Sequence, residues 1–176
     1  MARLRRTVDD ELQGPERHNF AIPSSDTGMR GVEELVGRED ELENIHAALV
    51  GDGTCRTVIL DGLGSIGKTQ LAIAYPKRHK DSYSAVFWLK FRDVASVKRT
   101  FAITSRRILR YHHSASLVCS DLTGSLDDTV DAVLAWLSDL DSTRWLAIYD
   151  EYDNPRVLSN NDSDAIDMDQ YLPDAW

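Results

Sequence analysis

The sequence predicts an α/β fold in which helices alternate with the strands of an open parallel sheet. Three short apolar runs are separated by stretches with helical periodicity along the 176-residue chain. Alternation of this kind is typical of βαβ units with right-handed crossovers. The last run, at residues 145–150, is unbroken until its final aspartate, which indicates a strand buried on both faces. The chain length suits one domain with a sizeable core.

The N-terminal part divides into an irregular leader and a first helix. Residues 1–34 are polar and show no sustained period, so we expect a flexible leader followed by one domain over residues 35–176. Within that domain Leu42, Ile45, His46 and Leu49 recur at the spacing of one helix face, which predicts an amphipathic helix.

The remaining elements alternate between the two periodicities. In chain order we expect a strand at 57–61, a helix ending near residue 79, a strand at 85–89, a helix at 94–111, a loop at 114–125, a helix at 126–140 and a strand at 145–150. Pro76 predicts a kink or an early end of the helix that contains it.

A glycine-rich segment between the strand at 57–61 and its helix has the spacing GxxxxGK(S/T). The segment consists of Gly62, Leu63, Gly64, Ser65, Ile66, Gly67, Lys68 and Thr69, and Gln70 follows in the helix. This is the pattern of a phosphate-binding loop, in which backbone N–H groups converge on an anion at a helix N-terminus. A plain glycine turn is the alternative, but the flanking strand and helix favour a nucleotide site. We expect Lys68 to reach the β- and γ-phosphates and Thr69 to bind Mg²⁺.

Acidic residues follow the last predicted strand. Asp150 ends that strand, and the carboxyl ends of parallel strands border the crevice where ligands bind. We therefore expect Asp150 to hold Mg²⁺ together with Thr69, as a Walker B aspartate does. Glu151 and Asp153 compete for the role of positioning or deprotonating an attacking water. The alternative for either residue is a solvated acid in a turn.

The composition limits which binding partners and which cellular compartment we expect for this protein. The net charge of −9 argues against a broad nucleic-acid footprint. No apolar stretch approaches the roughly 20 residues that span a bilayer, and the apolar core of a secretory signal is absent. Cys55 and Cys119 are the two cysteines, which favours reduced thiols. We expect a cytoplasmic protein that binds neither nucleic acid nor membrane.

Four segments in order resemble the nucleotide-binding domain of NLR-like STAND ATPases, most closely the NB-ARC and NACHT-like proteins of fungi. They lie at residues 36–42, 62–72, 85–89 and 145–155, and the resemblance covers about residues 35–173. It implies the three-layer sandwich of P-loop NTPases. It also implies ADP or ATP with Mg²⁺ as the ligand, and Val36, Gly37 and Arg38 as contacts on the base side of the nucleotide.

The sequence departs from that family in two respects. Members usually have glycine where Ser65 stands. The resemblance also implies a further strand ending in a sensor arginine, then helical and winged-helix domains, and none of these follows Pro173. We therefore expect an incomplete sheet of about three core strands, cut off after the Walker B region. The strand at 57–61 would then line an unpaired edge, which predicts marginal stability or self-association.

Together these observations predict an ADP/ATP-binding domain, or a fragment of one, from an intracellular STAND-type signalling switch with slow Mg²⁺-dependent hydrolysis. In such a domain Lys68 would neutralise the charge that develops on the phosphates, and Glu151 or Asp153 would orient the attacking water. One alternative is a non-catalytic fragment that associates with itself or with full-length NLR-like relatives. A small-molecule P-loop kinase is the other, although no acceptor site or arginine-bearing lid is evident.

Overall fold

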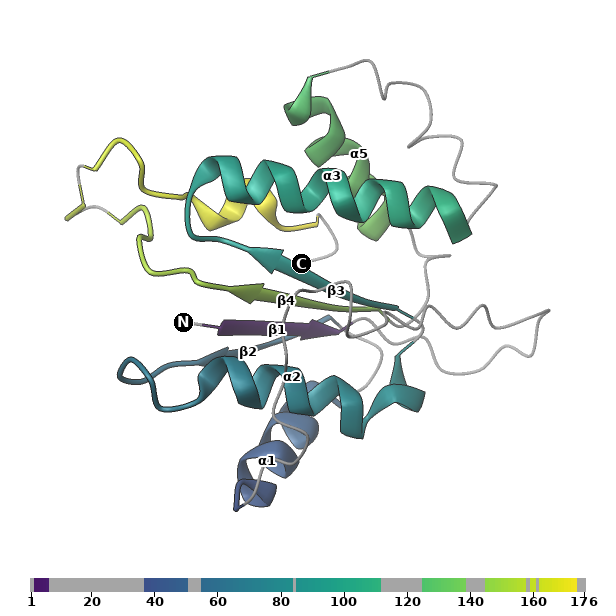
Figure 1. Ribbon diagram of the computed structural model, residues 1–176, viewed down its shortest axis with the longest axis vertical. Helices are drawn as coiled ribbons and strands as arrows, with labels where there is room; N and C mark the ends of the chain where they lie inside the picture. The colour runs from purple at the N-terminus through teal and green to yellow at the C-terminus, as the bar shows by residue number, and fades with distance from the viewer. Residues whose placement is uncertain are drawn as a thin grey trace. The chain divides into compact units, whose positions relative to one another are not determined.

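A computed structural model shows a mixed α/β protein (Figure 1). It describes residues 2–6, 37–50, 55–83, 85–111, 125–138, 145–157, 159–160 and 162–173. The strands are β1 (Ala2–Arg6), β2 (Arg56–Leu60), β3 (Ala85–Lys90) and β4 (Trp145–Asp150). The α-helices of the described residues are α1 (Glu39–Leu49), α2 (Lys68–Arg78), α3 (Val94–Tyr111) and α5 (Leu126–Ser138). Two short 3-10 helices lie at Lys80–Ser82 and Met168–Tyr171.

The chain forms two compact units. The first comprises Met1–Trp88 and Thr143–Asp150, and the second comprises Leu89–Ser142 and Glu151–Trp176. Because the first unit contains the glycine-rich segment and Asp150, the candidate site can be described within that unit.

The sheet has the strand order β2-β1-β4-β3. β1 runs antiparallel to β2 on one side and to β4 on the other, so that Leu4 stands opposite both Val58 and Ile148. It follows that β2 and β4 are parallel to each other, and Figure 1 shows β3 running in the same direction as β4. The sheet is therefore a small parallel set with one antiparallel strand inserted.

The strand β1 corrects three expectations from the sequence. Within the leader expected at residues 1–34, Ala2–Arg6 form a strand, whereas residues 7–34 lie outside the described residues. The sheet is mixed and not purely parallel, and it contains four strands instead of about three. The side of β2 that faces β4 is paired, where an unpaired edge was expected. The sequence Ala-Arg-Leu-Arg-Arg contains no run of β-forming residues, and the strand obtains its backbone hydrogen bonds from two distant segments.

The other predicted elements are confirmed, with shifts of at most one residue at the described ends. β2 begins one residue earlier than expected, and α3 has the predicted bounds. Pro76 lies in the last turn of α2, which continues to Arg78 before His79 N–H donates to the carbonyl of Tyr75 at 3.0 Å. The predicted loop at 114–125, apart from its last residue, and the end of the helix at 139–140 lie outside the described residues.

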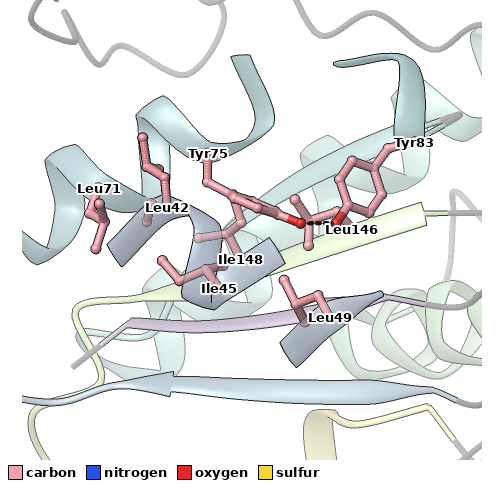
Figure 2. Close-up of a cluster of buried hydrophobic side chains, with 9 residues drawn as sticks. Leu42, Ile45, Leu49, Leu71, Tyr75, Tyr83, Leu146 and Ile148 are labelled. Atoms are coloured by element: carbon pink, nitrogen blue, oxygen red, sulfur yellow. Dashed lines mark hydrogen bonds between the residues drawn. The ribbon is translucent and has the colours of Figure 1, made fainter. Parts of the chain in front are cut away.

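The core of the first unit lies where α1 and α2 cover one face of the sheet (Figure 2). One apolar stripe from each helix packs against two side chains of β4. The buried cluster consists of Leu42, Ile45, Leu49, Leu71, Ala72, Tyr75, Tyr83, Leu146 and Ile148. The predicted stripe of α1 is confirmed by Leu42, Ile45 and Leu49, all at most 4% exposed. Every residue of β4 is buried, as expected for a strand covered on both faces.

A polar network crosses this apolar cluster. The hydroxyls of Tyr75 and Tyr83 are 2.6 Å apart, and Nδ1 of His46 lies 3.2 Å from the Tyr75 hydroxyl. The ring of His79 stacks on His46 with centroids 3.9 Å apart. Burial is the main cause that lowers the pKa of His79 below its ordinary value, and the charges of His46 and Arg78 lower it further. Nε2 of His79 is buried without a hydrogen-bond partner, so protonation there is unfavourable.

The lowered pKa of His79 predicts that the protein is less stable in mild acid. The unfolded chain binds a proton near pH 6.5, while the folded chain binds it only at lower pH. The stabilisation is therefore complete above pH 6.5 and is lost as the pH falls through the folded-state pKa. Urea unfolding at pH 7.5 and pH 5.5 should show this loss, and His79→Phe should reduce it. Arg78→Gln, at an exposed site, should reduce it partly because one of the charges is removed; an identical pH dependence in all three proteins would contradict the assignment.

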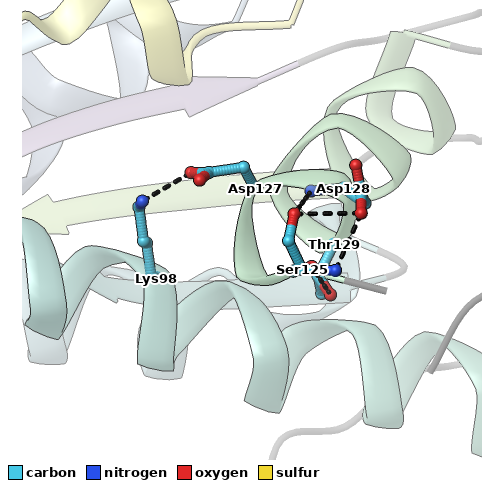
Figure 3. Close-up of polar contacts among 5 residues, drawn as sticks. All are labelled: Lys98, Ser125, Asp127, Asp128 and Thr129. Atoms are coloured by element: carbon cyan, nitrogen blue, oxygen red, sulfur yellow. Dashed lines mark hydrogen bonds and ion pairs between the residues drawn. The ribbon is translucent and has the colours of Figure 1, made fainter. Parts of the chain in front are cut away.

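In the second unit α3 packs against α5 through buried apolar side chains. Val97, Phe101 and Ile108 of α3 and Val133 of α5 are 0% exposed. At the start of α5, Ser125 and Asp128 form a capping box, in which each backbone N–H donates to the side chain of the other residue (Figure 3). Nζ of Lys98 on α3 lies 2.6 Å from Oδ1 of Asp127 (Figure 3). The hydrogen bond between these two side chains raises the pKa of Lys98.

The segment after β4 packs through aromatic contacts within the second unit. The ring of Phe91 meets Tyr152 and Tyr171 edge-on, with centroids 6.1 and 5.6 Å apart. The Tyr152 hydroxyl donates to the carbonyl of Ile166 at 3.1 Å. These contacts hold the segment that begins with the candidate water-positioning residues. None of the helices in the described residues combines the length and the apolarity that crossing a bilayer requires.

Candidate nucleotide site

The glycine loop, by which we mean residues 62–67, connects β2 to the first turn of α2. Gly62 and Gly67 both have positive φ, at 145° and 90°. A φ of 145° strains any residue that has a Cβ, so the position of Gly62 favours glycine. A Cβ there would also lie 2.4 Å from Cδ1 of Ile66, whose side chain would have to move. Gly67 occupies the N-cap position of α2 in the left-handed conformation, and its carbonyl accepts from Leu71 N–H at 2.9 Å. The loop therefore ends at the backbone N–H groups of a helix N-terminus, the feature that an anion site requires.

Ser65 has a left-handed backbone with φ of 65°. Such a conformation costs a non-glycine residue roughly 1–2 kcal/mol. The family that this chain resembles usually has glycine at this position, and the observed φ gives a physical reason for that preference. Serine is accepted here with strain, and its side chain is exposed.

Lys68 lies over the glycine loop. Its Nζ donates to the carbonyls of Gly62 and Leu63, at 2.6 and 2.9 Å. These carbonyls are neutral acceptors, and phosphate oxygens would form stronger, charge-assisted hydrogen bonds with the same amine. The expected contact of Lys68 with the phosphates stays a prediction.

Thr69 and Asp150 are brought together although 81 positions separate them in the sequence. The Thr69 hydroxyl donates to Oδ1 of Asp150 at 3.1 Å, and its distance to Oδ2 is 3.5 Å. Mg²⁺ binds oxygen at 2.0–2.1 Å in octahedral geometry, which sets adjacent ligand oxygens about 2.9 Å apart. The two side chains therefore fit a shared Mg²⁺ after a small adjustment, with the threonine proton reoriented.

Asp150 is 4% exposed at the end of β4. A buried carboxylate is costly unless a hydrogen bond or a cation compensates its charge. In the described part of the chain, no group of three or more His, Cys, Asp or Glu side chains could hold a metal. Mg²⁺ in nucleotide sites is held by one or two protein oxygens and takes its other ligands from phosphates and water.

The segment before α1 also reaches the glycine loop. Nη2 of Arg38 donates to the carbonyl of Ile66 at 2.6 Å, and Nη1 lies 3.8 Å from Glu41. Gly37 has φ of 78°, whereas Val36 lies outside the described residues. In this structure Arg38 thus contacts the loop itself, and the expected contact of residues 36–38 with an adenine base stays a prediction. Nothing in the sequence pattern pointed to this bond with the loop.

Glu151 and Asp153 begin the second unit. Glu151 is half-buried with a left-handed backbone, φ 62°, while Asp153 is exposed and its N–H donates to the carbonyl of Glu151 at 3.1 Å. A left-handed non-glycine residue is strained, and such residues gather at functional sites. That Glu151 or Asp153 positions a water stays a prediction. The structure thus gathers the glycine loop, Lys68, Thr69, Asp150 and Arg38 in one unit; Gln70 follows in the first turn of α2.

The chain is similar to a protein of the fungus Hyaloscypha variabilis named nucleotide-binding leucine-rich repeat (NLR)-like protein. The two sequences are 27% identical over 169 residues, which cover 88% of this chain but 15% of the relative. The chain therefore corresponds to a small part of that longer protein. No family model matches the sequence, and no solved structure matches it. The similarity indicates an NLR-like relationship for most of the chain.

Proposed function

We propose that this chain is an ADP/ATP-binding domain, or part of one, from an NLR-like signalling ATPase of the STAND type. The observation that carries the proposal is the Thr69 hydroxyl 3.1 Å from the Asp150 carboxylate, directly beside the glycine loop. A loop with phosphate-binding spacing and a hydroxyl–carboxylate pair at its end are the two parts that Mg²⁺-nucleotide binding needs. The similarity to an NLR-like protein supports the same class.

Each residue has a defined task in this proposal. The backbone N–H groups of the glycine loop and α2 hold the β-phosphate, and Lys68 neutralises charge on the β- and γ-phosphates. Thr69 and Asp150 hold Mg²⁺, which supplies further charge neutralisation when bound. Hydrolysis, where it occurs, is slow and uses Glu151 or Asp153 to orient water. Exchange of ADP for ATP would bias a two-state signalling switch.

The melting temperature with and without Mg²⁺-ADP tests the proposal. A ligand that binds only the folded chain stabilises it by about 2.7 kcal/mol at 100 times its Kd. Mg²⁺-GDP serves as the control for base preference. The absence of a shift in melting temperature at millimolar Mg²⁺-ADP or Mg²⁺-ATP would refute the proposal.

Phosphate release by Glu151→Gln and by Asp153→Asn, assayed separately, then identifies the base.

Asp150→Asn should remove the contribution of Mg²⁺ while leaving the fold intact. Asparagine keeps the size of the side chain and an oxygen that accepts from Thr69, but it lacks the charge that holds a divalent cation. We expect ADP affinity without Mg²⁺ to stay within about twofold, and the gain from Mg²⁺ to be lost; each tenfold of that gain is 1.4 kcal/mol. Titration calorimetry with Mg²⁺ or EDTA measures both quantities. Asp81→Asn, at an exposed site in the same unit, is the control, and an undiminished Mg²⁺ gain in Asp150→Asn would show that the metal binds elsewhere.

A second candidate, a non-catalytic interaction fragment, is favoured by the outer edge of β2. In the described part of the chain β2 ends the sheet, and its Ile59 is 51% exposed. An exposed edge with an apolar side chain is a template for pairing with another chain. Light scattering that shows self-association, together with no nucleotide shift, would favour this alternative.

A further inference from the structure

The two halves of the candidate site stand on strands that are not neighbours in the sheet. β2 leads into the glycine loop and β4 ends at Asp150, and β1 lies between these two strands. β1 pairs with β2 from Ala2↔Leu60 to Arg6↔Arg56 and with β4 from Arg3↔Tyr149 to Arg6↔Leu146. Adjacent strands are about 4.8 Å apart, so β1 sets a separation of roughly 10 Å between the strands that carry the two halves.

The Thr69–Asp150 hydrogen bond depends on that separation. The hydroxyl–carboxylate distance is 3.1 Å, and Asp150 directly continues the paired part of β4. If β1 left the sheet, β2 and β4 would each lose one row of backbone hydrogen bonds, and nothing in the register would hold them at two strand spacings. The glycine loop continues directly into α2, so its own geometry does not depend on β1 in the same way.

β1 differs from the strands beside it in how it joins the chain. Thirty residues, 7–36, separate it from Gly37, whereas β2 continues into α2 through the short glycine loop. It also runs antiparallel to both neighbours and has three arginines among five residues. A short strand near a chain end, joined to the next described element through 30 residues, can detach and re-enter without unfolding α1 or α2.

We propose that the gap between β2 and β4 is a strand-docking site for Ala2–Arg6, and that docking of this strand is coupled to Mg²⁺-nucleotide binding. The inference rests on the proposed function, because the coupling passes through a Mg²⁺-nucleotide held by Thr69 and Asp150. A ligand that fixes the loop and Asp150 at one distance stabilises the sheet with β1 in place. By reciprocity the docked strand raises affinity for that ligand by the same factor.

Hydrogen exchange on the intact chain measures the coupling without any variant. At saturating Mg²⁺-ADP the backbone amides of Ala2–Arg6 should exchange at least tenfold more slowly, and by a larger factor than the amides of β3, which report general stabilisation. Mg²⁺-free ADP should have a smaller effect, since it does not engage Asp150. Unchanged exchange of the β1 amides at saturating Mg²⁺-ADP would overturn the inference.

Removal of residues 2–6 tests the same coupling by measuring how the strand affects nucleotide affinity. The shortened chain should keep its affinity for Mg²⁺-free ADP within a few fold, because that ligand needs only the loop and α2. It should lose at least tenfold in affinity for Mg²⁺-ADP, and a peptide of residues 1–8 added in trans should restore it. A folded, shortened chain with undiminished Mg²⁺-ADP affinity would overturn the inference. Where the shortened chain does not fold alone, the exchange experiment decides.

A disulfide tests the location of the strand independently of nucleotide. Leu4→Cys with Val58→Cys joins two residues in register, whose Cα atoms lie about 4.5–5.5 Å apart in such pairs, within the range of a disulfide. Cys55 and Cys119 are replaced by serine in this variant. An intrachain cross-link that forms with and without Mg²⁺-ADP supports the docking site. If the cross-link does not form in a chain that binds Mg²⁺-ADP, the docking site is refuted. If it forms in a chain that binds no nucleotide, the pairing of β1 with β2 stands, but the proposed function and the coupling are rejected.

Discussion

Lys68→Ala is expected to abolish most of the nucleotide-dependent stabilisation. The amine of Lys68 donates to two loop carbonyls at 2.6 and 2.9 Å, and it is the cation that the loop presents to a bound phosphate. A hydrogen bond to a charged group contributes about 1.5–3 kcal/mol, so its loss should lower ADP affinity roughly 10- to 100-fold.

The melting experiment makes this loss visible. At 100 times Kd the unaltered chain gains about 2.7 kcal/mol, which raises the Tm of a domain of this size by roughly 5–10 °C. At the same ADP concentration a variant weakened 100-fold would gain only about 0.4 kcal/mol, or roughly 1 °C. The Tm without nucleotide should change little, because the two hydrogen bonds of Lys68 are exposed.

Lys77→Ala is the matched control for this prediction. Lys77 is an exposed lysine in the last turn of the same helix, so its removal changes net charge and helix composition equally but leaves the loop intact. A nucleotide shift that is equally reduced in both variants would mean that the ligand responds to net charge alone. A full shift in Lys68→Ala would mean that the phosphates bind away from the glycine loop.

The parts of the fold that could be predicted are those with a local sequence signal. Leu42, Ile45 and Leu49 mark one face of α1, and the unbroken apolar run of β4 marks a strand covered on both sides. The approach of Thr69 to Asp150 also followed from a general rule, because loops at the carboxyl ends of parallel strands meet at one edge of the sheet. Periodicity suffices for α1 and β4 because each depends on residues close together in the chain, whereas the Thr69–Asp150 pair, 81 positions apart, was expected from the topology of a parallel sheet.

The parts that could not be predicted depend on segments far apart in the chain. β1 is a strand because β2 and β4 supply its hydrogen bonds, while its own residues show no strand pattern. The bond of Arg38 to the Ile66 carbonyl likewise depends on where tertiary packing sets α1 against the glycine loop. Backbone pairing and side chain–backbone bonds leave no periodic trace in the sequence.

Ile148→Ala is expected to destabilise the first unit strongly. Ile148 is 0% exposed, lies in the cluster formed by α1, α2 and β4, and stands opposite Leu4 in the sheet. Truncating a buried isoleucine to alanine costs about 2–5 kcal/mol because a cavity remains. That is a large share of the 5–15 kcal/mol typical of a folded domain. Urea unfolding monitored by circular dichroism measures the loss.

Ile59→Ala makes the same chemical change on a strand of the same sheet. Ile59 is 51% exposed on β2, so its truncation leaves no closed cavity and should cost about 1 kcal/mol or less. Equal losses in the two variants would contradict the arrangement of the core.

Because Ile148 lies two residues before Asp150 on the strand that β1 pairs with, its truncation should also weaken the Mg²⁺-dependent part of ADP binding. The Ile59 variant should retain that part, since neither the glycine loop nor Asp150 depends on the Ile59 side chain; the comparison therefore separates loss of core packing from loss of the site.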